Sequence, residues 1–409
     1  MAGMRTVEEI LNRDADKYDS TVFGAEPREN YNRIMLSPVL SGEKSFDEII
    51  INSREWYAEN DITLHAGDAV TMVDADAKTV ESASGQKVAY DKLLLATGSE
   101  PFIIPVPGVD LPGVVTFRDL DDVNRMLDAA KSGGSAVVIG GGLLGLEAAV
   151  GLKANGMDVT VVHLMDTLME RQLDEAAGYL LASELEGRGL TVLTGANTKA
   201  ILGEDKVTGL QLDDGAVINA DLVVMAVGIK PNVTLAKEIS LEVGRGVKIN
   251  DQMQTSNPDI YAVGECVEHR GATYGLVAPL YEMGKILADH LTGGEGVAYQ
   301  GSVTSTKLKV TGVDVFSAGD FSGGDGAEDI VFRDASRGVY KRIVVRDDKI
   351  EGAVLYGDAK DGAWYFPLMK DGADITDLRD TIVLGQAYAG GVQADTSAAV
   401  AALDRRSAA

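Results

Sequence analysis

Hydrophobic and polar positions alternate with two different periods along this chain, and the two periods predict an α/β protein. Residues 4–13 have apolar positions at helical spacing, residues 18–26 predict a short strand that ends in an acid, and residues 45–61 predict a helix. Strand-like alternation follows over residues 62–82 and 86–97, with a Ser-Gly turn between the two runs. The first hundred residues therefore mix helices with short strands.

A second region begins after a proline-rich linker at residues 100–113 and repeats the order helix, strand, helix, strand. Its strands are predicted at residues 135–140, 157–164 and 190–195. Strands that alternate with helices are typical of a parallel sheet covered by helices. From about residue 301 the pattern changes to strands with Gly and Asp turns, and from about residue 390 to a tail that we expect to fray.

Composition narrows the classes of function. The chain has 409 residues, 45% of them hydrophobic and 24% charged, which suits a globular protein of several domains. Its net charge of −26 argues against a nucleic-acid partner, because affinity for phosphate backbones depends on Lys and Arg. The one cysteine, Cys266, excludes disulfides within the chain and sites built from several of its cysteines. The four histidines are far apart in sequence, and we expect no metal site.

No segment predicts export or a membrane span. The first residues include Glu8 and Glu9 and lack an apolar core followed by a small-residue cleavage site. Residues 135–152 are weakly polar over nearly the length of a membrane span, but their glycines and Glu147 favour a strand, a tight turn and a buried helix. We therefore expect a cytoplasmic protein.

The most specific motif is a glycine-rich turn. Gly140, Gly142 and Gly145 form G-x-G-x-x-G directly between a predicted strand and a predicted helix. The first glycine permits the tight turn, the second lets the backbone approach a pyrophosphate, and the third lets the helix pack against the strand. The helix N-terminus then offers N–H groups to the phosphates. The turn predicts a dinucleotide site.

The residue that would choose between NADH and NADPH is not evident. In this kind of site an acid about 20 residues after the turn binds the ribose 2′-hydroxyl, whereas an Arg accepts a 2′-phosphate. Here the second strand ends at His163, with Asp166 and Arg171 beyond it. His163 is therefore a candidate contact, and NADH is only the default.

Two shorter motifs lie on either side of the glycine turn. Ala96-Thr97-Gly98 ends a predicted strand, and Gly264-Glu265 follows the predicted strand 260–262. In this order the motifs resemble those of flavoprotein reductases with two dinucleotide-binding domains, and above all the ferredoxin and rubredoxin reductase branch that lacks a redox disulfide. In that family a Gly-acid pair, usually Gly-Asp, holds the ribityl and phosphate region of the flavin. The resemblance gives this role to Gly264-Glu265.

Such a protein is expected to open with a strand and a G-x-G-x-x-G of its own. Here the chain begins Met1-Ala2-Gly3 and runs directly into a predicted helix. Gly3 can be the third glycine of that motif, and Glu26, at the end of the next strand, stands where a ribose-binding acid would lie. We expect the first strand and two glycines to lie upstream, with Met1 an internal methionine. The alternative is that they are absent.

Five longer sequence segments point to a more specific family resemblance. They are MAGMRTVEEIL, YNRIMLSPVLSG, VVHLMDTLMERQLDEAAG, YAVGECVEHRGATYGLVAPLYE and DGAWYFPLMKDGADI. From residue 1 to about 390 the chain resembles the FAD-containing N-terminal half of the large subunit of NAD(P)H-dependent assimilatory nitrite reductases. That half passes electrons from NAD(P)H to a [2Fe-2S] segment and then to a sirohaem and [4Fe-4S] half that reduces nitrite. With a single cysteine, this chain cannot hold those clusters, and we expect it to be the electron-input module.

The resemblance also implies roles for individual residues. Arg33 and Ser37 would line the flavin, and Pro38 stands where related rubredoxin reductases often have a lysine. Glu147, the one catalytic candidate, would lie between flavin and nicotinamide, and a helix N-terminus at residues 275–279 would stabilise the reduced flavin. The expected cofactor-binding residues are Gly3, Glu26, Arg33, Ser37, Ala96, Thr97, Gly98, Gly140, Gly142, Leu144, Gly145, His163, Gly228, Gly264, Glu265, Val277 and Ala278.

The expected fold is α/β, with two Rossmann-like dinucleotide-binding domains and a small α+β C-terminal domain. The FAD domain is expected to be discontinuous and to lack its first strand. The expected boundaries are 1–112 and 246–298 for the FAD domain, 113–245 for the NAD(P) domain, 299–390 for the C-terminal domain and 391–409 for the tail.

FAD and NAD(P)H are the expected cofactors. The expected partner is an iron–sulfur and sirohaem nitrite reductase component or a ferredoxin-like acceptor, with a homodimer left open. Two alternatives remain. One is a stand-alone NADH:ferredoxin or rubredoxin reductase, and the other is a non-catalytic truncated fragment with impaired FAD binding.

Overall fold

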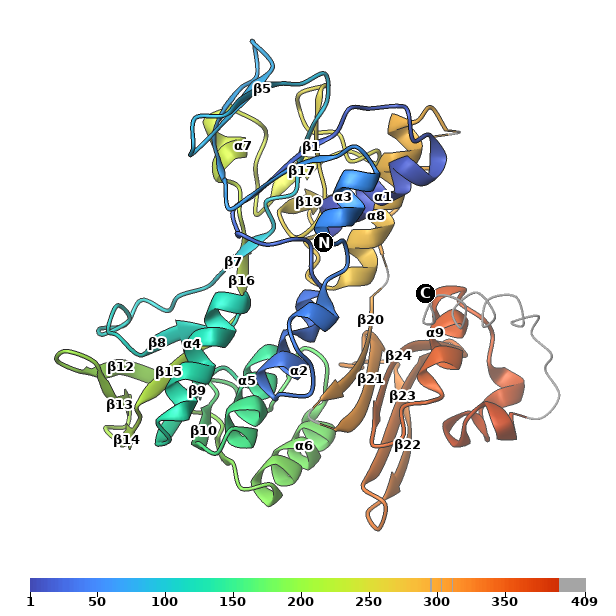
Figure 1. Ribbon diagram of the computed structural model, residues 1–409. Coiled ribbons are helices and arrows are strands. Elements are labelled where there is room, and N and C mark those ends of the chain that lie inside the picture. The colour runs from blue at the N-terminus through green and yellow to red at the C-terminus, as the bar shows by residue number, and fades with distance from the viewer. Residues whose placement is uncertain (295, 303, 311, 390–409) are drawn as a thin grey trace.

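The computed structural model describes residues 1–294, 296–302, 304–310 and 312–389, which form three regions (Figure 1). The first region joins elements from the start of the chain to elements around residues 247–291. The middle region holds the glycine turn, and the third is a C-terminal sheet. The expected tail, 391–409, lies outside the described residues.

The middle region is built on one five-stranded parallel sheet. Its strand order is β11-β10-β9-β15-β8, and β10 pairs with β9 from Asp158–Ser135 to Val162–Ile139. Both faces of the central strands are covered: the helices α4, α5 and α6 pack on one face, as the alternating sequence predicted, and a small antiparallel sheet packs on the other. The elements are β8 (Val114–Thr116), α4 (Leu120–Lys131), β9 (Ser135–Ile139), α5 (Leu143–Ala154), β10 (Asp158–Val162), α6 (Glu175–Gly187), β11 (Thr191–Leu193) and β15 (Leu222–Met225). The small antiparallel sheet consists of β12 (Thr198–Gly203), β13 (Val207–Leu212) and β14 (Val217–Asn219), and it packs on the face that the helices leave free.

The first region contains three separate pairs of parallel strands rather than one parallel sheet. The pairs are β1 (Thr21–Gly24) with β2 (Thr63–Ala66), β6 (Leu93–Leu95) with β18 (Ile260–Ala262), and β17 (Val247–Ile249) with β19 (Val267–His269). Helix α1 (Ala2–Arg13) packs along α8 (Val277–Leu291). The pairing of β6 with β18 makes this region discontinuous in sequence, as expected. The smaller strands are β3 (Val70–Asp74), β4 (Thr79–Ser82) and β5 (Lys87–Ala89).

The helix predicted at residues 45–61 is wrong as one element. The chain instead forms a single helical turn at Asp47–Ile49, an extended stretch, and then α3 (Arg54–Glu59). The main-chain N–H groups of Ile51 and Asn52 in the extended stretch donate to the carbonyl of Asn30, which competes with helix formation. The Ser53 side chain accepts a hydrogen bond from the Trp56 N–H and starts the helix again, which is typical of a Ser N-cap.

Strand pairing and helix packing both join the first and middle regions. Strand β7 (Ser99–Pro101) pairs with β16 (Ile229–Pro231), and α2 (Leu36–Leu40) packs on α5. The side-chain amide of Asn155, at the end of α5, donates to the carbonyl of Leu40 at 2.7 Å. The short helix α7 (Thr234–Glu238) follows β16.

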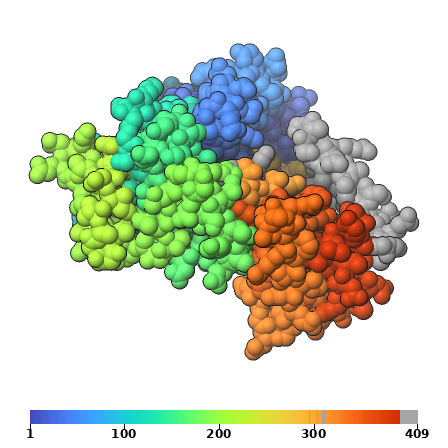
Figure 2. All heavy atoms as spheres, turned by 90° about the horizontal axis from the view of Figure 1, so that it is seen from below, coloured from blue at the N-terminus to red at the C-terminus, as the bar shows by residue number. Residues whose placement is uncertain are grey.

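The C-terminal region is an antiparallel sheet covered on one face by helix α9 (Gly362–Lys370). Its order is β20-β21-β24-β23-β22, and it lies against α6, as Figure 2 shows where orange meets green. The hydroxyl of Tyr340 donates to Asp174 at the start of α6 at 2.6 Å, and that of Tyr356 donates to the Leu180 carbonyl at 3.2 Å. The strands are β20 (Ser305–Val310), β21 (Val313–Gly319), β22 (Glu328–Asp334), β23 (Val339–Arg346) and β24 (Lys349–Tyr356). Within the described ranges, every helix is too short or too polar to span a bilayer.

Candidate functional site

The three glycines of the turn between β9 and α5 have different surroundings. Gly140 has φ +116°, and a Cβ there would collide with the carbonyl oxygen of Ala226. A Cβ at Gly145 would collide with the carbonyl oxygen of Gly140. Gly142, the N-cap residue of α5, would place a Cβ in open space. The first and third glycines are therefore required by the fold, whereas the second leaves a free approach to the helix N-terminus.

The ends of three parallel strands bring further predicted residues to this turn. β9, β10 and β15 are neighbours in the sheet, so Gly140, His163 and Gly228 lie at or just beyond the same edge. The Nδ1 atom of His163 accepts a hydrogen bond from the N–H of Gly141 at 3.0 Å. Leu144, in the first turn of α5, is 40% exposed. The sequence-predicted dinucleotide residues are thus gathered at one edge, and their roles stay a prediction.

A second set of predicted residues meets at the start of α1. A Cβ at Gly3 would lie 2.8 Å from the Cβ of Ala96, and a Cβ at Gly264 would lie 3.2 Å from that of Ala2. The main-chain N–H of Arg33 donates to the Met1 sulfur at 3.4 Å. Segments that are far apart in the sequence therefore converge on one helix N-terminus.

Two carboxylates at this second cluster are each paired with an arginine. Glu26 forms an ion pair with Arg33 and accepts a hydrogen bond from the hydroxyl of Tyr31 at 2.6 Å. Burial, and to a smaller extent this carboxylate, raises the pKa of Tyr31, so its hydroxyl remains a donor.

The second carboxylate, Glu265, forms an ion pair with Arg118 and accepts a hydrogen bond from Ser99 at 2.7 Å. Sequence reasoning missed both Arg118 and Ser99. The available signal was that Arg118 lies just beyond the end of β8, a strand of the parallel sheet, where site residues gather in such folds.

Glu147 connects the two nucleotide regions. It lies in α5 just beyond the glycine turn, and its carboxylate contacts the hydroxyl of Ser37 on α2 of the first region. Burial raises the pKa of Glu147, and the Ser37 hydrogen bond only partly opposes the shift. Among the described residues no basic side chain forms an ion pair with it, which agrees with Pro38 standing where related proteins often have a lysine.

The raised pKa gives a prediction for stability. Below the ordinary glutamate pKa of 4.5, Glu147 is protonated in both the folded and unfolded states and carries no penalty. As pH rises through the higher folded-state pKa, deprotonation of the buried carboxyl destabilises the fold. We expect Glu147→Gln to be more stable than wild type at neutral pH, with the difference in Tm vanishing toward pH 4.5.

Thermal unfolding across a pH series measures this effect. Ser37→Ala is the matched variant with the opposite sign, because it removes the hydrogen bond that lowers the pKa of Glu147. It should lose more stability than wild type as pH rises. Parallel pH profiles for wild type and Glu147→Gln would contradict the prediction.

For the remaining predicted residues, the structure gives only their element or a single hydrogen bond. Val277 and Ala278 begin α8, and the hydroxyl of Thr97 donates to the Asn232 carbonyl at 2.7 Å.

Cys266 is fully buried next to the carbonyls of Leu95 and Val263, and burial raises the pKa of its thiol. Within the described part of the chain, no three His, Cys, Asp or Glu side chains gather as a metal site requires.

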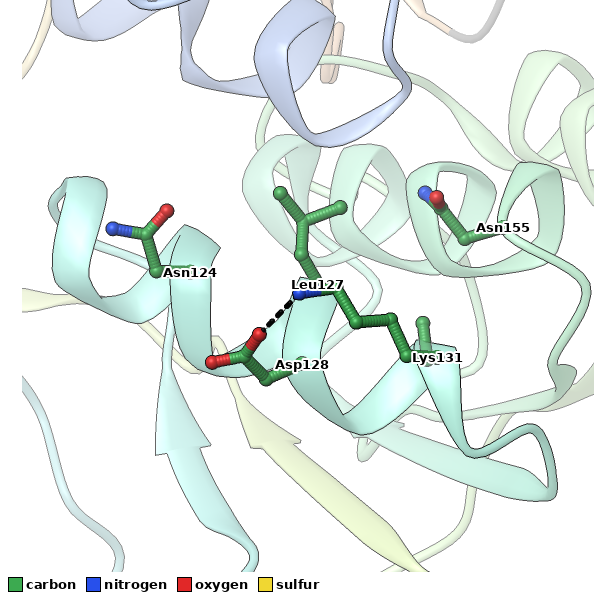
Figure 3. A pocket seen from close by; sticks show the side chains of 6 residues that line it. Asn124, Leu127, Asp128, Lys131 and Asn155 are labelled. Atoms are coloured by element: carbon green, nitrogen blue, oxygen red, sulfur yellow. Dashed lines mark hydrogen bonds and ion pairs between the residues drawn. The ribbon is translucent and has the colours of Figure 1, made fainter.

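A pocket of about 460 Å³ opens between α4 and the end of α5 (Figure 3). Its two charged residues, Asp128 and Lys131, form an ion pair with each other at 2.7 Å. Asn155 also lines it, at the opposite end of α5 from the glycine turn. The pocket therefore lies away from the gathered strand ends.

Comparison with known proteins gives the family. Residues 1–284 match the pyridine nucleotide-disulphide oxidoreductase family, whose members bind FAD and NAD(P)H, and residues 305–373 match the rubredoxin NAD+ reductase C-terminal domain. Nitrite reductase [NAD(P)H] from Bacillus subtilis is 53% identical over 94% of this chain and 48% of its own length. The assimilatory nitrate reductase electron transfer subunit of the same organism is 48% identical over 88% of this chain and 47% of its own length. The chain thus spans about half the length of these curated relatives.

The crystal structure of NADH:rubredoxin oxidoreductase from Clostridium acetobutylicum superposes with a TM-score of 0.78. It is 27% identical and covers 94% of this chain and 96% of its own. The two Rossmann-like domains and the antiparallel C-terminal domain are therefore confirmed as the fold. The chain therefore belongs to the pyridine nucleotide-disulphide oxidoreductase family, as an NAD(P)H-dependent oxidoreductase similar to the nitrite reductase large subunit.

Proposed function

We propose that this chain is the electron-input module of an assimilatory nitrite reductase. It takes a hydride from NAD(P)H through FAD and delivers electrons to an iron–sulfur and sirohaem component that reduces nitrite. The observation that carries the proposal is the 53% identity to nitrite reductase [NAD(P)H] over nearly the whole chain. The single cysteine supports the assignment of the iron–sulfur clusters to the other component, because a cluster is bound by several cysteines.

The residues around the start of α1 fit FAD. Helix α1 has 12 residues, and the N–H groups at its N-terminus would hold a phosphate of FAD. Glu26 would bind the adenosine ribose and Glu265 the ribityl chain, while Arg33 and Arg118 offset the added negative charge. When bound, FAD takes two electrons from NAD(P)H and can release them one at a time.

The other nucleotide would lie at the β9 turn. Gly142 would let the pyrophosphate approach the N–H groups of α5, and Glu147 would help to orient the nicotinamide. Ser37 holds the Glu147 carboxyl from the FAD side, so that one contact sets both cofactor regions relative to each other. Alignment of the two rings is the main task of the protein, because hydride transfer needs no acid or base from the chain.

Visible spectroscopy under anaerobic conditions tests this proposal. The purified protein, supplied with FAD and then freed of unbound flavin by gel filtration, should show a flavin spectrum that is bleached by NADH or NADPH. Adding the oxidised iron–sulfur and sirohaem component of nitrite reductase should restore the oxidised spectrum. A protein that binds no FAD would support the non-catalytic alternative, and a flavin that neither nucleotide reduces would contradict any reductase activity.

A stand-alone rubredoxin or ferredoxin reductase is the second candidate. It is favoured by the match of residues 305–373 to the rubredoxin reductase C-terminal domain and by the fold similarity along nearly the full length of the Clostridium enzyme. The two candidates differ in the acceptor. Faster reoxidation of the reduced flavin by rubredoxin than by the nitrite reductase component would favour the second candidate.

A further inference from the structure

His163 is held tightly at the end of β10. Its Nδ1 accepts from the Gly141 N–H at 3.0 Å, and a Cβ at Gly141 would lie 2.8 Å from the His163 Cγ. The residue is only 8% exposed. In Rossmann units the residue at this strand end ordinarily binds the adenosine ribose itself. Here the Nδ1 atom of the imidazole instead accepts a hydrogen bond from the glycine turn.

The second ring nitrogen fixes a carboxylate at the same place. Because Nδ1 accepts a hydrogen bond, the neutral ring carries its proton on Nε2. That atom lies 3.1 Å from the carbonyl oxygen of Thr167 and 3.2 Å from a carboxylate oxygen of Glu170. The Glu170 side chain is 35% exposed, so it remains accessible to a ligand at the strand end.

The charges around this strand end are unbalanced toward the negative. Asp166 and Glu170 both lie in the segment that follows β10, and His163 is the only group of the described residues that pairs with either. Arg171, the nearest base in sequence, is exposed and forms no ion pair within the described part of the chain.

We propose that Glu170, oriented by His163, binds the adenosine ribose hydroxyls and makes this chain select NADH over NADPH. The proposal rests on the dinucleotide site of the proposed function and supplies the acid that the sequence lacks at the strand end itself. A ribose 2′-hydroxyl can donate to the carboxylate, whereas a 2′-phosphate brings a second negative charge against it.

Titration calorimetry with two fragments, ADP-ribose and 2′-phospho-ADP-ribose, tests the proposal without requiring flavin or electron acceptor. We expect wild type to bind ADP-ribose at least about 10-fold more tightly, since like charges disfavour the phosphorylated fragment. In Glu170→Gln this preference should fall toward 1, with a gain in affinity for the phosphorylated fragment. Glu175→Gln, an exposed acid on α6 without contact to His163, should keep the wild-type ratio.

Three results overturn the proposal. They are an unchanged ratio in Glu170→Gln, an equal fall of the ratio in Glu175→Gln, and a wild-type preference for the phosphorylated fragment that Arg171→Gln abolishes. If wild type binds neither fragment, the dinucleotide site of the proposed function fails as well, so the two failures are distinguishable.

Discussion

Gly142→Val is expected to weaken NADH binding by about 10- to 100-fold, since a lost hydrogen bond to a charged group costs about 1.5–3 kcal/mol, while the fold loses only about 1 kcal/mol of stability. An added Cβ at Gly142 meets nothing within 4 Å, and the residue has φ −82°, which any L-residue adopts. The fold should therefore accept a Cβ here, and the loss of stability is limited to the exchange of an N-cap glycine for valine. The space that it fills is the one through which a pyrophosphate would approach the N–H groups of α5.

Two further glycine variants separate binding from folding. Gly187→Val, at the end of α6, also enters open space and should change neither NADH affinity nor Tm. Gly145→Ala should lower Tm, because its Cβ would collide with the Gly140 carbonyl. Calorimetric binding and thermal unfolding measure both effects. Wild-type NADH affinity in Gly142→Val would exclude the turn as the pyrophosphate site.

The glycine turn could be predicted from sequence because its determinants are local. An apolar strand, three glycines at fixed spacing and a helix follow one another within 20 residues, so periodicity and turn chemistry point to the same structure. The helix predicted at residues 45–61 failed for the opposite reason. Its apolar spacing was overruled by the hydrogen bonds of Ile51 and Asn52 to Asn30, a contact over 20 residues that no periodicity reports.

The pairing of the predicted site residues with one another and with other side chains could not be found from sequence either. Glu147 and Glu265 were predicted from motifs, but Ser37 lies 110 residues from the first and Arg118 lies 147 residues from the second. Likewise, the link from His163 to Glu170 depends on the path of the chain after β10 and follows no motif. Side-chain pairing across elements is a tertiary property, and it decides how each motif residue is charged and oriented.

Lys341 in the C-terminal sheet belongs to a buried group of paired charges. This lysine is only 3% exposed, and its ammonium lies 3.0 Å from Asp361 and 3.1 Å from Asp358. Asp361 precedes α9 and also accepts the Gln386 N–H at 3.2 Å. The pair therefore joins β23, the start of α9 and the last described turn of the chain.

We expect Lys341→Met to lower the free energy of unfolding by about 3–5 kcal/mol, because it leaves a buried carboxylate without its counter-ion. The double variant Lys341→Met with Asp361→Asn should recover much of this loss, since asparagine can still accept the Gln386 N–H without a charge. Denaturant unfolding of the wild type, both single variants and the double variant gives the coupling between the two sites. Additive losses would mean that the two residues do not act as a pair.

The pH dependence of the same variant gives an independent check. Burial opposes ionisation of Asp358, but the hydrogen bond and charge of Lys341 outweigh it and hold the pKa of Asp358 below its usual value. At pH values above the unfolded-state pKa of Asp358, this depressed pKa stabilises the fold. The stabilisation disappears as pH falls through the folded-state pKa. The deficit of Lys341→Met should therefore be largest at neutral pH and shrink in acid, where Asp358 becomes protonated. A deficit that is the same at all pH values would instead assign the loss to packing of the lysine side chain.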